Sequence, residues 1–187
     1  MRTRDNEELR FSSGDRDVPI LQGQEFSSDA VEGVRVRVEG GLIVAHTGLK
    51  RTEQTAEMLT PVLCFEEEPL ILPQFRERLG GTLAGLRFSE LQRIFPDLKS
   101  PAGLWTIEAL EMGLESVETF LGRIEDGLNR LTQLVSEVDA TLLVAHAGSI
   151  KGIKAVLTEE KECKRRRVLC EPTPEHKIFF HFQIERR

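Results

Sequence analysis

Two short runs of the chain are apolar throughout and end in a histidine. They are 42–46 (LIVAH) and 142–146 (LLVAH), and each is followed by one small residue and a glycine. Runs that are apolar on both faces are typical of buried strands in a parallel sheet covered by helices on each side. The alternating run 34–38 (VRVRV) predicts an edge strand or hairpin arm, and 178–184 (IFFHFQI) predicts a final strand.

Between these strands, apolar positions recur with helical spacing. Those from 49 to 63 predict one helix, with a proline near its end, and Ser89 with Gln92 predicts a capping box that starts a second. A long amphipathic helix is predicted over 117–138, and another over 150–157. The resulting order of elements predicts an α/β fold, with three layers around a mostly parallel sheet.

Length and composition fit a single domain, 1–187. The chain has 187 residues, of which 40% are hydrophobic and 30% charged, and no apolar run approaches the length of a membrane span. With 25 basic and 31 acidic residues, its net charge of −6 argues against broad nucleic-acid binding. The one basic run, 164–167 (KRRR), is flanked by glutamates and predicts a solvated loop or helix face.

Cysteine is sparse, with Cys64, Cys163 and Cys170 only. Because no export signal accompanies them, a reducing, cytoplasmic location is expected. The last two cysteines and the histidines at 176 and 181 miss the spacing of a zinc site, in which paired cysteines usually stand two to four residues apart. We therefore expect no metal.

Three segments place reactive side chains beside glycines or helix starts. His146 ends a strand just before Ala-Gly-Ser, which suits phosphate binding, proton transfer or nucleophilic attack, or simply a strand end. Arg51 lies in the first turn of a helix, where it suits either a phosphate or a surface salt bridge. Glu77 precedes a glycine-rich loop; burial would make it a general acid, whereas its two flanking arginines would hold it ionised.

Taken in order, these segments resemble the motifs of the histidine phosphatase superfamily. LIVAHTGLKRTEQTAEML resembles a strand, S-P-L-x-R and a helix with Q-T-A, and FRERLGGTLAGL resembles the E-x-x-x-G-x-x-x-G loop. MGLESVETFLGRI is similar to the G-G-E-S helix start, and LLVAHAGSI resembles the motif of the second catalytic histidine. Near the start, NEELR and GDRDVPI resemble N-x-x-x-R and G-x-x-D-x-P-L, so the likeness covers nearly the whole chain.

The resemblance implies a phosphoglycerate mutase-like fold and phosphoryl chemistry that needs no metal or cofactor. It implies that Arg51 and Asn6 bind the phosphoryl group, and that Thr47, where the family usually has serine, helps them. It also implies that Glu77 protonates the leaving oxygen and that His146 stabilises the charge on phosphorus. The expected partner is a small phosphorylated metabolite, whose identity the sequence does not give; nor does it give the oligomeric state.

One family motif has no counterpart here. The family's nucleophile is the histidine of R-H-G, at the end of its first, central strand, and counting back from Asn6 places that histidine before Met1. Three explanations are open: an N-terminally truncated chain, a shortened protein that keeps only a phosphate site, or transfer of the attack to His46. Backbone pairing favours truncation, because removing a central strand leaves its two neighbours with unpaired groups.

The expected function is that of a phosphomonoester hydrolase with a phosphohistidine intermediate, inactive in this chain without its nucleophile. The alternatives are a non-catalytic phosphate-binding pseudoenzyme and a phosphotransferase of the phosphoglycerate mutase type. The short stretch between Gly85 and Gly113 favours hydrolysis, since mutases of this family usually carry a longer insertion after the glutamate loop.

Overall fold

The computed structural model describes Thr3, residues 16–26, 42–99, 109–134 and 140–159 (side chains to 157), and the backbone of two later strands. Its helices, strands and short 3₁₀ turns (η) follow in chain order: β1 (Leu42–His46), α3 (Lys50–Leu59), β2 (Leu70–Ile71), η1 (Pro73–Phe75), η2 (Gly81–Leu83), α4 (Phe88–Ile94), η4 (Leu110–Met112), α5 (Val117–Leu134), β3 (Ala140–Val144), α6 (Ala147–Glu159), β4 (Arg166–Leu169) and β5 (His181–Ile184).

The main sheet is parallel, with the strand order β2-β1-β3. β1 pairs with β3 along five residues, from Leu42 opposite Ala140 to His46 opposite Val144. This register confirms both strands predicted from the sequence, although β3 begins and ends two residues earlier than its apolar run and is half-buried along its length. Among the described strands, β3 is the last in this order and pairs on one edge only, with β1; the absence of a further strand beside it stays a prediction.

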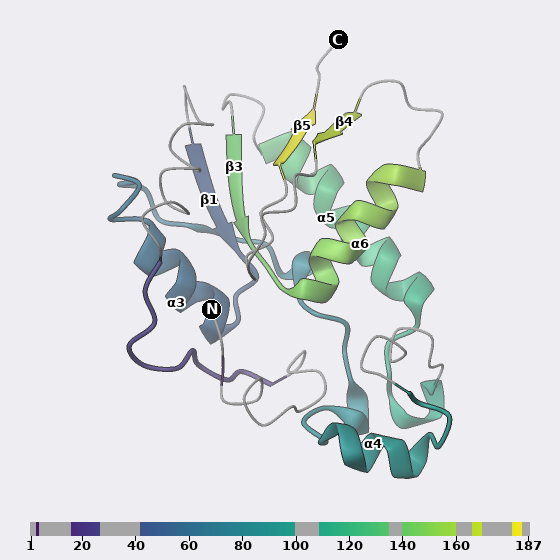
Figure 1. Cartoon of the computed structure of the whole chain (residues 1–187). Coiled ribbons are helices and arrows are strands. Elements are labelled where there is room, and N and C mark those ends of the chain that lie inside the picture. The colour runs from purple at the N-terminus through teal and green to yellow at the C-terminus, as the bar shows by residue number, and fades with distance from the viewer. Residues whose placement is uncertain are drawn as a thin grey trace.

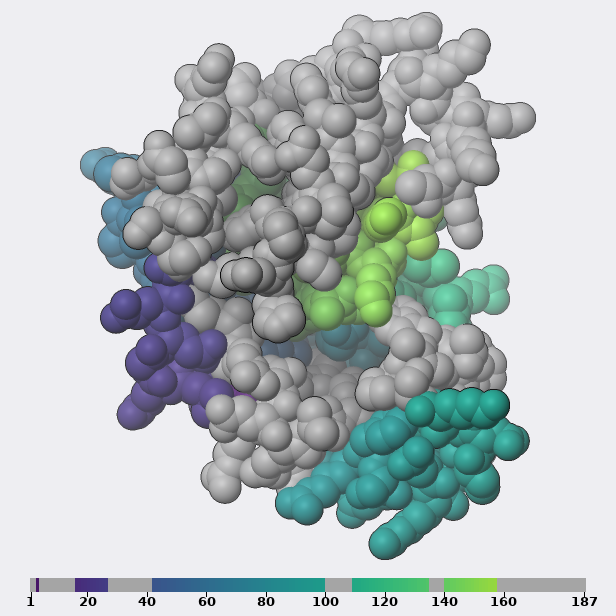
Figure 2. Space-filling model, in the orientation of Figure 1, coloured from purple at the N-terminus to yellow at the C-terminus, as the bar shows by residue number. Residues whose placement is uncertain are grey.

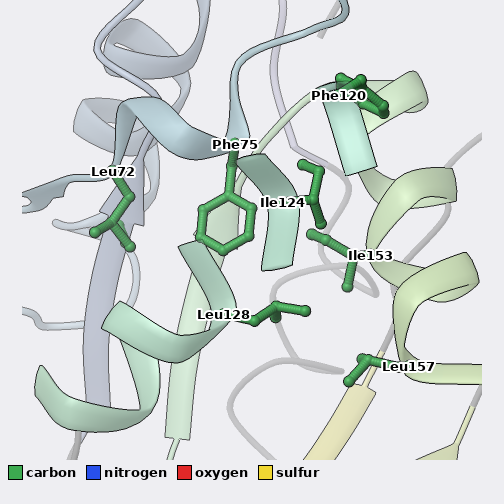
Figure 3. Packing of buried hydrophobic residues seen from close by; sticks show 8 residues of the cluster. Leu72, Phe75, Phe120, Ile124, Leu128, Ile153 and Leu157 are labelled. Atoms are coloured by element: carbon green, nitrogen blue, oxygen red, sulfur yellow. The ribbon is translucent and has the colours of Figure 1, made fainter. Parts of the chain in front are cut away.

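Helices lie on both sides of this sheet (Figure 1). α3 packs against β1 and β3, whereas α5 and α6 pack against each other on the other side. Aliphatic and aromatic side chains from α5, α6 and the segment after β2 fill the space between these two helices and the sheet (Figure 3). The α/β architecture predicted from the sequence is therefore confirmed, and the carboxyl ends of β1 and β3 meet at one edge.

A second, smaller apolar cluster surrounds α4. Its buried members come from the segments on either side of residues 100–108 and are Leu83, Leu91, Leu98, Ala109 and Leu114. Figure 2 shows the α4 region (teal) and residues 16–26 (purple) at two separate places on the same face of the molecule. The loop that carries Glu77 connects this cluster to the main core.

The predicted capping box at the start of the second helix is wrong. Ser89 lies inside α4, and the carboxylate of Glu90 accepts the hydrogen bond of the Arg87 N–H at 2.6 Å. The Gln92 amide donates instead to the carbonyl oxygen of Leu98 at 3.1 Å. An acidic side chain at the third helical position satisfies the free N–H group as well as a glutamine would, two residues earlier than predicted.

The chain's last strands form a separate antiparallel pair. β4 pairs with β5 from Arg166 opposite Ile184 to Leu169 opposite His181, which confirms a strand near the predicted end. The loop or helix face predicted for the basic run is wrong for its last two residues, since β5 supplies the backbone partners that make them a strand. The predicted strand at 34–38 and the cysteines at 163 and 170 lie outside the described residues.

Candidate functional site

The register of β1 and β3 brings Thr47 and His146 together just beyond the strand ends. The Thr47 hydroxyl lies 2.9 Å from Nε2 of His146, although 99 residues separate them in the sequence. Both side chains are buried, with exposed fractions of 0% for Thr47 and 8% for His146. This edge of the sheet is where open α/β folds bind their ligands.

Arg51, in the first turn of α3, reaches the same point from the other side. Its Nε–H donates to Nδ1 of His146 at 3.2 Å, and its Nη1 donates to the carbonyl oxygen of Arg16 at 2.8 Å. The guanidinium is partly buried. Its planar set of donors is suited to a phosphate, which can accept several of them at once.

Glu77 approaches from the loop after η1. Its Oε2 accepts the hydrogen bond of the Gly148 N–H at 3.0 Å, at the start of α6, and its Oε1 accepts that of the Arg78 N–H at 3.0 Å. Gly148 lies two residues after His146. Arg51, His146 and Glu77, all selected from the sequence, therefore surround one edge of the sheet.

Burial raises the pKa of the Glu77 carboxyl above its ordinary value. The two backbone hydrogen bonds and the charges of Arg51 and Arg123 act in the opposite direction but do not cancel this effect. The arginines flanking Glu77 do not hold it ionised: the Arg76 guanidinium donates to the carbonyl oxygen of Thr47, and that of Arg78 to the carbonyl oxygen of Glu115. A raised pKa suits a proton donor.

A residue absent from the sequence-based predictions, Arg123 of α5, holds the Glu77 loop in place. Its guanidinium donates to the carbonyl oxygens of Gln74 (2.6 Å), Arg76 (3.0 Å) and Glu77 (3.3 Å). The carboxylate of Glu115 accepts two further hydrogen bonds from it, at 2.8 and 3.0 Å. The sequence signal for this role was an arginine beside an apolar stripe position of the long helix. In the structure, the Arg123 guanidinium lies 5.1 Å from the centre of the Phe120 ring.

His146 is neutral at ordinary pH in this setting. Burial, followed by the charges of Arg51, Arg123 and Arg76, lowers its pKa from 6.5 to about 3. An imidazole without charge can accept a hydrogen bond from Arg51, as the geometry requires.

This shift predicts that acid destabilises the fold through His146. The unfolded chain takes up a proton near pH 6.5 and the folded chain only near pH 3, so the free energy of unfolding falls as the pH drops between these values. We expect about 2 kcal/mol to be lost from this group between pH 7 and pH 5. Urea unfolding at both pH values should show a correspondingly smaller loss in His146→Gln; equal losses in both proteins would contradict the assignment.

His46, which the sequence offered as a substitute nucleophile, has a local role in the turn after β1. Its Nδ1 accepts the hydrogen bond of the Gly48 N–H at 3.1 Å, and its side chain is buried. Burial also lowers its pKa, against the opposing charges of Glu53 and Glu57. Its use as a nucleophile stays a prediction.

The segment 16–26 packs onto the start of α3. The carboxylate of Asp17 accepts the hydrogen bond of the Lys50 N–H at 2.6 Å, and the Ile20 N–H donates to the Gln54 side chain at 3.0 Å. This contact places the Arg16 carbonyl beside Arg51. Asn6, the other predicted phosphate ligand, lies outside the described residues.

In the described part of the chain, no group of three or more histidine, cysteine, aspartate or glutamate side chains could hold a metal ion. No helix in the same part is both long and apolar enough to cross a membrane.

The fold and this site define an α/β protein with a basic, partly buried centre at the carboxyl ends of its parallel strands. Solved structures share the fold. One is a mycobacterial glucosyl-3-phosphoglycerate phosphatase in complex with VO3, with a TM-score of 0.68 and 20% identity over 98% of this chain and 94% of that one. Another is a phosphoglycerate mutase from Bacillus anthracis, with a TM-score of 0.66 and 16% identity over 86% and 77% of the two chains.

The family is shown by the sequence. The family model of the histidine phosphatase superfamily (branch 1) matches residues 2–175, nearly the whole chain. No curated protein matches the chain in a sequence search. The chain belongs to the histidine phosphatase superfamily, as the order of its motifs predicted.

Proposed function

We propose that this protein is a phosphomonoester hydrolase of the histidine phosphatase type, acting on a small phosphorylated metabolite. The convergence of Arg51, His146 and Glu77 at one edge of the sheet supports this proposal. Arg51 binds the phosphoryl group, Glu77 protonates the departing oxygen and His146 stabilises the charge on phosphorus. Asn6 is proposed as a further phosphate ligand.

In the proposed reaction, a histidine supplied by an R-H-G motif attacks phosphorus. The new P–N bond forms as the P–O bond to the alcohol breaks, and the alcohol oxygen takes the proton of Glu77. Water then attacks the phosphorus of the phosphohistidine and gives a proton to Glu77. The new P–O bond forms as the P–N bond breaks, which frees the histidine and releases inorganic phosphate.

A non-catalytic phosphate-binding protein is the second candidate, and one observation favours it. In the described part of the chain, both nitrogens of His146 are hydrogen-bonded and Nδ1 of His46 accepts a local backbone N–H. Neither ring is therefore presented as a ready nucleophile. This candidate predicts binding of phosphate without turnover.

Turnover distinguishes the candidates, and Glu77→Gln tests the proposed proton donor. Relative to the native protein, we expect the kcat of Glu77→Gln to fall about 10²- to 10⁴-fold, because glutamine cannot give a proton to the leaving oxygen. The loss should be larger with glycerol phosphate than with p-nitrophenyl phosphate, whose leaving group needs no proton. Phosphate affinity should change little.

Glu125→Gln provides the matched control, since Glu125 is exposed on α5. It should leave both substrates unaffected. If Glu77→Gln turned over both substrates at the wild-type rate, the role of Glu77 would be refuted. Phosphate binding without any turnover by the native protein would select the second candidate.

A further inference from the structure

The contact between Arg51 and His146 determines which ring nitrogen carries the proton. The Nε of arginine is only a donor, so Nδ1 of His146, 3.2 Å away, must be an acceptor without a proton. In a neutral imidazole the single proton is then on Nε2. That nitrogen faces the Thr47 hydroxyl at 2.9 Å.

The other end of this chain of hydrogen bonds gives the same assignment independently. The Thr52 hydroxyl donates its one proton to the carbonyl oxygen of Leu49 at 2.8 Å. It therefore accepts from Thr47, whose hydroxyl lies 2.9 Å away. With its own proton used in this way, Thr47 can only accept from His146, so Nε2 must be protonated.

All three linked side chains are shielded from water. The exposed fractions are 0% for Thr47, 3% for Thr52 and 8% for His146. An unmade hydrogen bond at such a depth is costly, because no water replaces the missing partner. The direction of the whole relay, from Arg51 to the Leu49 carbonyl, is thus fixed by its two ends.

We propose that Thr52, acting through Thr47, is a positioning residue that fixes the tautomer of His146 with its unprotonated Nδ1 toward Arg51. This proposal deepens the proposed function. It rests on that function only for the identity of the ligand that Nδ1 would contact, a phosphoryl group. In this arrangement Thr47 lies behind His146, whereas the sequence led us to expect it to contact the phosphate. The Thr47 proton, bonded to Thr52, is not available to a phosphate in this arrangement.

The proposal has a chemical consequence for a bound phosphoryl group. With Nε2–H held by Thr47, His146 can donate to a phosphoryl oxygen only after Nδ1 takes up a proton from solvent. The charged groups around the ring are Arg51 of α3, Arg123 of α5, and Arg76 and Glu77 of the loop. Added phosphate brings negative charge against this basic set and favours that uptake.

Nitrogen-15 NMR of the histidine rings tests the tautomer directly. The chain has four histidines, and the His146→Gln variant assigns the relevant signals. In wild-type protein near pH 7 we expect a protonated Nε2 and an unprotonated Nδ1, and protonation of Nδ1 when inorganic phosphate is added. A wild-type ring with its proton on Nδ1 would overturn the proposal without any variant.

Thr52→Val removes the hydroxyl but keeps the shape of the side chain. The freed Thr47 proton can then donate to Nε2 in rings that give up the Arg51 contact, so we expect a second tautomer beside the wild-type one and a phosphate affinity about fivefold lower. Thr52→Ser should restore the wild-type spectrum. Thr55→Val is the matched control, since the Thr55 hydroxyl donates to the Arg51 carbonyl on the same helix and does not touch His146.

An unchanged ring spectrum in Thr52→Val, or an equal change in Thr55→Val, would overturn the proposal. The outcome for the proposed function is separate. If the tautomers respond as expected but inorganic phosphate does not bind, the positioning role of Thr52 stands and the proposed function fails.

Discussion

Arg51→Ala is expected to lower the affinity for inorganic phosphate by about ten- to a hundredfold, the usual effect of losing charge-assisted hydrogen bonds. Arg51 supplies a partly buried set of donors beside His146, and alanine leaves only more distant charges to attract the anion. Titration calorimetry of both proteins with phosphate measures the change. The tertiary fold should be retained, because the Arg51 side chain lies at the edge of the core.

Lys50→Ala is the matched control. The Lys50 side chain is 60% exposed, and its Nζ lies 3.9 Å from the Asp17 carboxylate. A lysine in that position contributes long-range attraction only, which salt screens. Equal losses in the two variants would show that general positive charge, and not the placement of Arg51, attracts phosphate.

Gly81→Ala should be the most destabilising substitution in the glycine-rich loop, by about 2 to 5 kcal/mol. Gly81 has a φ of +54°, and a Cβ there would collide with the backbone of Gly113 and the carbonyl oxygen of Met112. These are backbone atoms and cannot turn aside as a side chain can. Since the loop carries Glu77, the variant should also disturb the site.

Gly122→Ala provides the comparison, because a Cβ at Gly122 in α5 meets no atom within 4 Å. Alanine in a helix is favoured over glycine, so this variant should be more stable than wild type by up to about 1 kcal/mol. Urea unfolding measures both changes. A Gly81→Ala protein within 1 kcal/mol of wild type would mean that the two loops do not approach each other as described.

The site could be predicted from the sequence where it depends on strand ends. The apolar runs ending in His46 and His146 place both histidines at the same edge of a parallel sheet. Arg51 and Glu77 were identified by their neighbouring helix start and glycines. The bond between Glu77 and Gly148 depends on the docking of the 73–80 loop, for which the local pattern gives no signal.

Other features could not be predicted because tertiary contacts create them. β2 has only two residues, too few for any alternation to be visible, and it is a strand because β1 supplies its backbone partners. In the sequence, Arg123 is indistinguishable from a surface arginine of a long helix. Its structural role comes from the hydrogen bonds that it donates to three carbonyl oxygens of the Glu77 loop. The link from Thr52 to His146 joins positions 94 residues apart.

The most direct test is a crystal structure of the protein with orthovanadate, the class of anion found with the mycobacterial phosphatase of the same fold. We predict the anion at the carboxyl ends of β1 and β3, with oxygens within hydrogen-bonding distance of the Arg51 guanidinium and the His146 ring. Glu77 should lie on the side where a leaving group would depart. An anion bound elsewhere, with Arg51 still bonded to His146 and Arg16, would contradict a phosphoryl site at this edge of the sheet.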